Sequence, residues 1–437
     1  MEPVSIDRPS RPRRSRSAPV YGLLFCALVA STAGASAARS HDTEARGRVV
    51  VGPGIAEDTV RQVIRTSRNV VYVLAPDDTA QRENPGPGVI RAYRASGGGA
   101  RAFAEVDAAH HPSSSGTNVL YAPDVRLDRH DVAHMVYVDQ ATERLYYQTF
   151  STVTNTWGPR RALAGGALVN PGFYATPTRV FRNWASYGLV LDRRDRSHVV
   201  YCSGNRVVSR VLTSQGWSPA RLAAAGRSPL HVQLAVDAAS NIYAAWLDDA
   251  LGAPGSSSIV YARQTAAGVW SAPQVVDRGS PDVLSNTTDD QGPSIVVTSS
   301  GIPYVMFLSG TTDSSGKAVS SATVRYLRGG RWRDDTPPSN GYGITHSPQL
   351  YSHGDDVYLF LGHDKNIHWG YLTQRAGRPW SRYVVLDAAS EMDGSVSVRW
   401  DPSRDHDPQL IDAVHHAEDF KGNRAYLPQL YYQAVNP

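Results

Sequence analysis

The chain has 437 residues, which is enough for two or three ordinary domains, and it carries 37 glycines, 28 prolines, 22 tyrosines and 9 tryptophans. Its formal net charge is +4, but the first 37 residues hold five arginines against two acidic residues, so about +1 remains for the rest. A nearly neutral chain without a basic stripe excludes nucleic acid as an expected partner. The composition and the lack of a long helical periodicity indicate an all-β protein.

The first 37 residues have the pattern of a secretory signal peptide. Arginines from Arg8 to Arg16 precede an apolar run from Val20 to Ala33, and Ala35-Ser36-Ala37 supplies the small residues of a cleavage site. We predict cleavage after Ala37 and a secreted protein, extracellular or periplasmic, with no stable membrane insertion afterwards. The alternatives are an uncleaved anchor, for which the apolar run is short, and a lipoprotein modified at Cys26.

The remaining chain is expected to form one domain. Residues 38–47 are polar and are predicted to be a disordered lead-in, and residues 48–437 are predicted to be the domain itself. Only Cys202 remains after cleavage, so no internal disulfide is possible and a buried, inert thiol is expected.

A unit of short apolar strands separated by tight turns recurs along this domain. Its clearest copy runs from Asp124 to Pro159, where VRLD and HMVYV flank a turn of Asp, Arg and His. Copies that recur at roughly 45 to 65 residues, each with several short strands, are typical of the blades of a β-propeller. Seven copies are recognised, and they begin at Val60, Asp124, Tyr187, His231, Pro293, Pro348 and Val396.

The last copy stops after its third strand, and the missing fourth strand is found at the other end of the domain. Arg48-Val49-Val50-Val51 resembles the fourth strands Gln274-Val275-Val276 and Tyr383-Val384-Val385. We therefore predict a seven-bladed β-propeller whose ring is closed by an N-terminal strand that completes the last blade. A six-bladed ring is the alternative, because the first copy is irregular.

Polar and aromatic residues precede the inner strand of each predicted blade, at the mouth of the central channel. Converging titratable groups in a concave mouth mark the expected position of a site. The alternative for any one of them is that it binds channel water or packs its own loop. The predicted catalytic residues are His346, His231, Asp290, Asp393 and Tyr187. The predicted substrate-binding residues are Arg61, Tyr121, Arg182, Trp184 and Gln291.

The units resemble the sialidase-like, BNR-type propellers, because an apolar strand, an Asp or Arg turn and a Trp-Ser step recur in them. The step is clearest at Trp217-Ser218, Trp270-Ser271 and Trp380-Ser381. The resemblance implies a secreted carbohydrate-active protein whose partner is a polysaccharide or glycoconjugate. No turn carries an Asp box and no segment matches the FRIP motif, so the resemblance concerns architecture. Asp289–Ser294 is similar to the D-D-H-x-x-P entry loops of lyase-type BNR proteins, with Gln291 in the place of histidine.

Two chemistries of glycan cleavage are left open, together with two other classes of function. A lyase acting on a uronate needs a cation beside the carboxylate, for which Arg61, Arg179 and Arg182 are the candidates. It also needs a base, for which His231, His346 and Tyr187 are the candidates. A glycoside hydrolase needs two carboxylates at a defined separation, for which Asp290 and Asp393 qualify. The alternatives are a non-catalytic lectin-like or scaffold propeller and an enzyme acting on a lactone, phosphate or small molecule. The entry loops differ from blade to blade, which favours one composite site over seven equal ones.

No metal motif of fixed spacing occurs in the sequence. The adjacent pairs His110-His111 and His415-His416 are poorly placed for joint ligation, because neighbouring side chains of a strand point apart. We expect no cofactor, a structural calcium ion being the one exception left open, and we expect a monomer.

Overall fold

The structure is a computed structural model, and all the residues that it describes belong to one compact unit, residues 43–437. The signal peptide and the lead-in predicted for residues 1–47 lie outside the described residues, so they stay predictions. The structure describes residues 49–54, 61–77, 88–96, 100–114, 120–139, 141–142, 144–163, 175–176, 179–180, 186–226, 229–248, 258–278, 292–312, 318–337, 345–363, 368–387, 396–399, 411–417 and 429–435.

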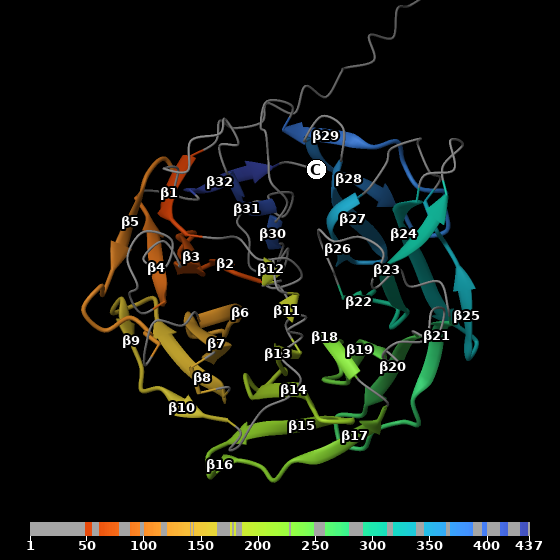
Figure 1. Ribbon diagram of the computed structural model, residues 1–437, viewed down its shortest axis with the longest axis horizontal. Helices are drawn as coiled ribbons and strands as arrows, with labels where there is room; N and C mark the ends of the chain where they lie inside the picture. The colour runs from red at the N-terminus through yellow and green to blue at the C-terminus, as the bar shows by residue number, and fades with distance from the viewer. Residues whose placement is uncertain are drawn as a thin grey trace, which may run out of the picture. The chain divides into compact units, whose positions relative to one another are not determined.

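Seven antiparallel sheets of four or five strands are arranged in a ring as the blades of a β-propeller (Figure 1), which confirms the predicted fold. In blades 1 to 6 the strands run outward from the channel in chain order. Blade 1 consists of β2 (Val63–Arg65), β3 (Val71–Asp77), β4 (Val89–Ala95) and β5 (Phe103–Val106). Blade 2 consists of β6 (Leu120–Leu127), β7 (Val132–Asp139), β8 (Arg144–Ser151), β9 (Thr156–Trp157) and β10 (Arg161–Ala162). Blade 3 consists of β13 (Tyr187–Leu191), β14 (Ser197–Ser203), β15 (Arg206–Thr213), β16 (Gly216–Trp217) and β17 (Arg221–Ala225).

The other four blades complete the ring. Blade 4 consists of β18 (Pro229–Val236), β19 (Ile242–Asp248), β20 (Ser258–Gln264) and β21 (Gln274–Arg278). Blade 5 consists of β22 (Ser294–Val297), β23 (Pro303–Thr312), β24 (Ala318–Arg328) and β25 (Arg331–Asp334). Blade 6 consists of β26 (Thr345–His353), β27 (Asp356–His363), β28 (His368–Gln374) and β29 (Val384–Asp387). Blade 7 consists of β30 (Val396–Arg399), β31 (Ile411–Ala417), β32 (Gln429–Val435) and β1 (Val49–Pro53). A separate two-stranded sheet, β11 (Ala175–Thr176) with β12 (Arg179–Val180), lies between the segments of blades 2 and 3 in the sequence.

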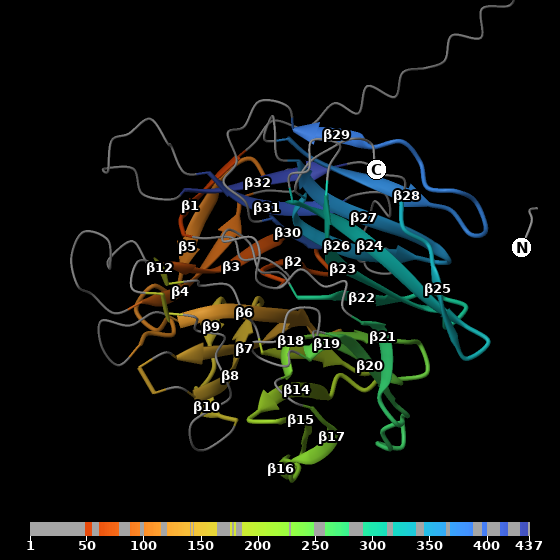
Figure 2. The ribbon, with the colours of Figure 1, turned by 45° about the vertical axis from the view of Figure 1, so that its right-hand side comes forward.

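The predicted closure of the ring is confirmed, because β1 from the start of the domain pairs with β32 from its end (Figures 1 and 2). Val49 lies opposite Tyr432, and a bulge follows before Gly52 pairs with Leu430. At Gly52 a side chain has no room, since a Cβ atom there would lie 2.6 Å from Cε1 of Tyr93 in blade 1. Blade 7 therefore has no missing strand, and the closing strand also packs on blade 1.

The turn after the inner strand is built around one aspartate in blades 2, 3 and 4. One carboxylate oxygen accepts hydrogen bonds of 2.8 to 3.0 Å from the backbone N–H groups two and four residues later. The other oxygen contacts a histidine or tyrosine six residues later, at 2.9 to 3.2 Å. The three aspartates are Asp128, Asp192 and Asp237, and their partners are His134, His198 and Tyr243. These bonds explain why an apolar strand followed by Asp recurs in the sequence, and they fix where each inner strand ends.

The repeated Trp-Ser step continues each blade at its outer edge. The backbone N–H of Ser218, Ser271 and Ser381 donates to the carbonyl of a residue in the third strand at 2.8 to 2.9 Å. The N–H of that third-strand residue donates in turn to Oγ of the serine at 2.9 to 3.1 Å. The tryptophan reaches the preceding blade. Nε1 of Trp270 donates to Oγ of Ser209 at 2.9 Å, and the Trp380 indole makes a similar bond to a backbone carbonyl of blade 5. The step thus joins neighbouring blades.

The core lies between the blades. Neighbouring residues of an inner strand point to opposite sides, so Val63 packs in the cluster between blades 7 and 1, and Ile64 packs in the cluster between blades 1 and 2. Further clusters join blades 2 to 4, blades 4 and 5, and blades 5 and 6. Cys202 of β14 is fully buried in the cluster of blades 2 to 4, as predicted for an inert thiol. Within the part of the chain that the structure describes, no helix has the length and apolarity needed to cross a membrane.

Candidate functional site in the central channel

The inner strands of blades 2, 4 and 6 carry a bulge at an equivalent place. The register shifts between Tyr121 and Asp124 in β6, between Leu230 and Gln233 in β18, and between His346 and Gln349 in β26. A bulge changes the side to which the following side chains point. It therefore determines which residues of each strand end face the channel.

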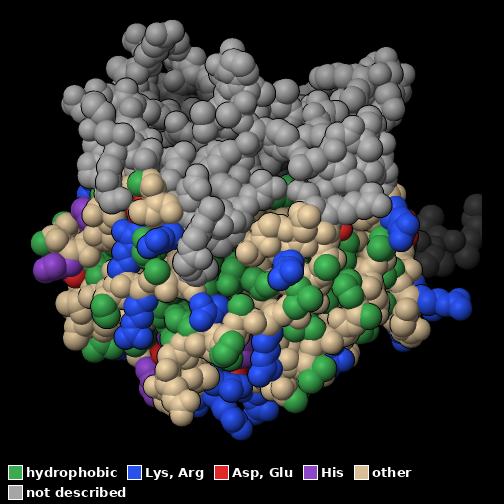
Figure 3. Space-filling model, turned by 60° about the horizontal axis from the view of Figure 1, so that its bottom comes forward, with side chains coloured by type: hydrophobic (Ala, Val, Ile, Leu, Met, Phe, Trp, Pro, Cys, Tyr) green, Lys and Arg blue, Asp and Glu red, His purple; other side chains and the backbone are tan. Residues whose placement is uncertain are grey.

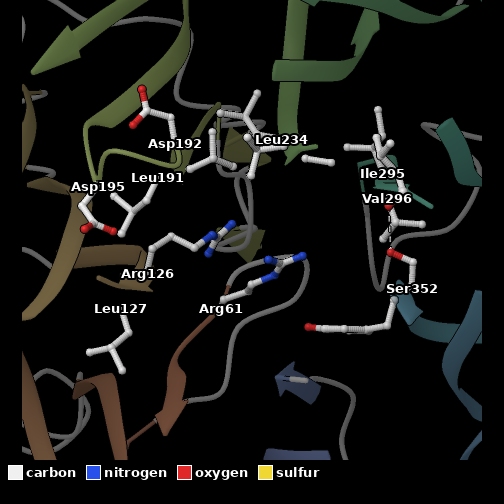
Figure 4. Close-up of a pocket in the computed structure, with 15 residues that line it drawn as sticks. Arg61, Arg126, Leu127, Leu191, Asp192, Asp195, Leu234, Ile295, Val296 and Ser352 are labelled. Carbon is white, nitrogen blue, oxygen red and sulfur yellow. Dashed lines mark hydrogen bonds between the residues drawn. The ribbon is translucent and has the colours of Figure 1, made fainter. Parts of the chain in front are cut away.

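A cavity of about 370 Å³ lies in the channel (Figure 4). It is lined by the last residues of the inner strands of blades 2 to 6 and by Arg61, which precedes β2. Nine of the fifteen lining residues are aliphatic. Figure 4 shows the guanidinium groups of Arg61 and Arg126 together in the middle of this space. The volume is at the small end of the range found for ligand sites, about 300 to 1,000 Å³.

Arg126 is held in the channel by its own strand. Arg126 and Asp124 are two residues apart in β6 and so share a face, and both terminal nitrogens of Arg126 donate to the carboxylate of Asp124. The same carboxylate accepts the backbone N–H of Leu189 from blade 3 at 2.8 Å. Burial lowers the pKa of Arg126 to about 10, an effect that Asp124 opposes and Arg61 increases. Arg126 remains a cation at neutral pH, and its buried Nε has no hydrogen-bond partner among the described residues.

Arg61 lies beside Tyr351, the second polar group on the wall. Its guanidinium carbon is 5.4 Å from the centroid of the Tyr351 ring, and its backbone carbonyl accepts the N–H of Val125 at 2.8 Å. Burial raises the pKa of Tyr351, although Arg61 and Arg126 both act to lower it. Tyr351 is therefore a phenol at neutral pH, with two cations next to it that would stabilise its phenolate.

The described wall carries two guanidinium groups, those of Arg61 and Arg126. The structure bonds one carboxylate to this pair, that of Asp124, which accepts from Arg126. Asp192 and Asp195 also belong to the wall, but the structure pairs Asp192 with Arg196 and His198, and Asp195 with Arg129. A partly buried pair of arginines with a deficit of negative charge can bind a carboxylate or a sulfate through paired hydrogen bonds. A tyrosine beside such an anion can exchange a proton with the anion or with a neighbouring atom of the bound ligand.

Of the residues predicted from the sequence, Arg61 lies on this wall. Tyr187 begins β13 and is buried among apolar residues of blades 2 to 4, and His231 lies in the bulge of β18 with a φ of 52°. His231 is 2% exposed, and burial lowers its pKa to about 3, so its imidazole is neutral. Neither Tyr187 nor His231 is among the described residues that line the cavity.

The other predicted residues are not tested by the structure. Tyr121 and His346 lie in β6 and β26, but their side chains are outside what the structure describes. The residues that lie wholly outside the described ranges are Asp290, Asp393, Arg182, Trp184 and Gln291. Their roles stay predictions.

Sequence reasoning missed Arg126, Asp124 and Tyr351, although a signal for two of them is present. The strand pairing places Arg126 and Tyr351 at similar positions of their inner strands, one and two residues respectively from the strand pairs that close their hairpins. At this position the other described blades carry an apolar residue: Ile64, Val190, Ala235 and Val296. A charged or phenolic residue that interrupts an apolar position shared by the repeats would have marked the site.

The described residues contain no group of three histidine, cysteine, aspartate or glutamate side chains placed to hold a metal ion. The fold and the cavity together define a seven-bladed propeller with a cationic site in its channel.

No protein-family model matches the chain, and no curated protein matches its sequence. Solved structures do match. A polysaccharide lyase named Uly1 is 13% identical with a TM-score of 0.54, over 87% of this chain and 90% of that one. A PL25 ulvan lyase bound to -[GlcA(1-4)Rha3S]- is 9% identical with a TM-score of 0.52, over 88% and 95%. The α-L-arabinofuranosidase Arb93A of Fusarium graminearum is 10% identical with a TM-score of 0.51, over 90% and 98%.

At these identities the likeness concerns the fold. The chain shares its propeller fold with enzymes that act on glycans. A structure of the mitotic checkpoint complex is similar to the same degree, with a TM-score of 0.52 and 12% identity over 94% of this chain and 98% of that one. The sialidase-like, BNR-type relationship therefore stays a prediction, and function has to be argued from the channel.

Proposed function

We propose that this protein is a secreted carbohydrate-active propeller that cleaves an acidic glycan in its central channel, by β-elimination at a uronate. The observation that carries the proposal is the cluster of Arg61, Arg126 and Tyr351 on the cavity wall. The fold shared with polysaccharide lyases and with an arabinofuranosidase supports a glycan as the substrate class. The predicted signal peptide supports secretion.

The roles follow from the chemistry of elimination. The uronate carboxylate binds Arg61 and Arg126, which neutralise its charge and make the C5 proton more acidic. The phenolate of Tyr351, which both arginines stabilise, takes the proton from C5. The C4–O bond breaks as the C4=C5 double bond forms, and Tyr351 returns the proton to the leaving oxygen. Asp124 positions Arg126 through their paired hydrogen bonds.

The test is a digestion of acidic and neutral polysaccharides by the full chain, in which reducing ends and the ultraviolet absorbance of unsaturated uronate are followed together. We expect both signals to rise on a uronate-containing substrate, and both to be lost in Tyr351→Phe. Reducing ends without the absorbance would contradict elimination and indicate a hydrolase, for which Asp290 and Asp393 are the candidates. The proposal of cleavage is wrong if neither signal rises on any polysaccharide of a broad panel.

One observation favours a second candidate, a lectin-like propeller that binds acidic glycans without cleaving them. The part of the cavity wall that the structure describes contains no histidine, and both of its aspartates are engaged by arginines. A binder would retain its affinity for the glycan in Tyr351→Phe, lose it in Arg61→Ala, and release no product with the wild-type chain.

A further inference from the structure

A second cavity, of about 170 Å³, lies away from the channel in the groove between blades 3 and 4. One wall comes from β14, β15 and β17 of blade 3, and the other from β19, the end of β20 and the turn that follows it in blade 4. Figure 3 turns the bottom of Figure 1, and with it blade 3, toward the viewer, and arginine side chains gather there.

Three arginines line this groove, and the structure pairs one of them with a carboxylate. Arg196 binds Asp192 through Nη2 at 2.6 Å and Nε at 2.7 Å, and His198 contacts the same carboxylate oxygen at 3.0 Å. Arg210 and Arg221 are bonded differently, to backbone carbonyls. The deficit of negative charge is therefore carried by these two.

The carbonyl contacts orient the two guanidinium groups without neutralising them. Nε of Arg210 donates to the carbonyl of Ser218 at 2.8 Å, and one terminal nitrogen donates to the carbonyl of Leu163. One terminal nitrogen of Arg221 donates to the carbonyl of Gly268 across the groove at 3.3 Å. Neither arginine has a carboxylate partner among the described residues. Arg221 is exposed and Arg210 is half-buried, so their remaining N–H groups can reach a ligand from solvent.

We propose that this groove is an oxoanion-binding site that takes the sulfate or carboxylate group of an acidic sugar. Guanidinium groups match both anions through paired hydrogen bonds, and the charge deficit of the groove favours them. The volume equals roughly five or six water molecules at about 30 Å³ each, which accommodates one oxoanion with part of a sugar ring. Val200 and Ile242 offer apolar contacts for ring carbons, and Gln264 offers an amide. The site lies outside the channel cavity and does not require that the channel be catalytic.

The test titrates the full chain with three probes by calorimetry: a heparin tetrasaccharide, a hyaluronan tetrasaccharide, which carries carboxylates alone, and inorganic sulfate. All variants carry Arg61→Gln, which weakens binding in the channel. In this background we expect Arg221→Gln and Arg210→Gln each to weaken the binding of at least one tetrasaccharide by fivefold or more. The matched control is Arg331→Gln, an exposed arginine of β25 in blade 5, which should change the affinity by less than twofold.

Three results would overturn the proposal. The first is that Arg61→Gln alone removes all binding, which would assign the probes to the channel. The second is that Arg221→Gln and Arg210→Gln bind both tetrasaccharides as tightly as the parent does. The third is that inorganic sulfate binds while neither tetrasaccharide does, which would indicate a site for a small anion. Failure of cleavage in the channel is measured by product release, so it is distinguishable from each of these results.

Discussion

Arg65 and Asp412 are 347 positions apart in the chain, and they form a buried ion pair at the place where the ring closes, with Nε of Arg65 2.8 Å from Oδ2 of Asp412. Arg65 ends the inner strand of blade 1, and Asp412 lies in β31 of blade 7. Arg399 donates to Oδ2 of the same carboxylate at 3.1 Å, and Tyr432 donates to Oδ1 at 2.6 Å. One carboxylate thus joins strands from both ends of the domain.

Asp412→Ala is expected to destabilise the propeller strongly. The substitution leaves the guanidinium groups of Arg65 and Arg399 buried without this carboxylate, and breaking a buried pair in this way costs about 3 to 5 kcal/mol. Equilibrium unfolding in urea measures the loss. The control is Arg129→Ala, which removes an ion pair between blades 2 and 3 in which the Arg129 side chain is 57% exposed. This exposed pair is worth less than about 1 kcal/mol, so equal losses in the two variants would contradict the assignment of Asp412 as the closing group.

The architecture of the ring followed from local rules that the sequence displays. The Asp turns at Asp128 and Asp192 and the Trp-Ser steps depend on residues close together in the chain, so their repetition revealed the blades and their number. The match of Val49-Val50-Val51 to other fourth strands revealed the closure. These features could be predicted because each repeat contains its own copy of the same hydrogen bonds.

The channel site could not be predicted in the same way. The bulge between Tyr121 and Asp124 decides which side chains of β6 face the channel, and no rule of apolar alternation reveals a bulge. The residues predicted from the sequence lie at the entries of the inner strands, whereas Arg126 and Tyr351 lie near the ends of theirs. The burial of a side chain could not be predicted from the sequence either. Histidine is a common proton-transfer residue, but the structure places His231 in the core, where burial lowers its pKa to about 3.

Arg126→Ala is expected to lower kcat/KM on an acidic glycan by about a hundredfold, because a charge-assisted hydrogen bond to the substrate carboxylate is lost, worth roughly 2 to 3 kcal/mol. Arg126→Lys keeps the charge but not the fork of donors, so we expect an intermediate loss. Initial rates of product formation at several substrate concentrations give the measurement. Arg331→Ala, an exposed arginine of blade 5, is the control. Unchanged kcat/KM in Arg126→Ala would place substrate binding elsewhere.

The activity is expected to increase with pH through the neutral range, because burial raises the pKa of Tyr351 and the phenolate is the reacting form. Arg61 acts to lower this pKa, so Arg61→Ala should move the rising limb of the kcat/KM profile to higher pH as well as weakening substrate binding. The measurement is kcat/KM between pH 6 and about 10. Tyr326→Phe, a half-buried tyrosine of β24 that stacks on Tyr304, is the control and should leave the profile unchanged. A profile that rises equally in Tyr351→Phe would exclude Tyr351 as the base.

Asp335→Asn is expected to stabilise the protein at neutral pH. Burial at the junction of blades 5 and 6 raises the pKa of Asp335 to about 6, although the bond from Gln374 opposes the shift. Between about pH 4 and pH 6 the folded state therefore holds more protons than the unfolded state, so the stability of the wild-type protein falls as the pH rises, and the full penalty is present above pH 6. Because Asp335 is only half-buried, solvent reduces the gain in the variant to about 1 kcal/mol.

Urea unfolding of wild type and Asp335→Asn at pH 4, 6 and 8 measures this dependence. The two proteins should be most alike at pH 4 and differ most at pH 8. Asp355→Asn is a control of opposite sign, because hydrogen bonds from Ser300 and Ser299 lower the pKa of Asp355, so its carboxylate stabilises the fold above its ordinary pKa. That variant should lose stability at pH 8. If Asp335→Asn keeps the pH dependence of the wild type between pH 4 and 8, the carboxylate of Asp335 does not titrate in the folded state as described.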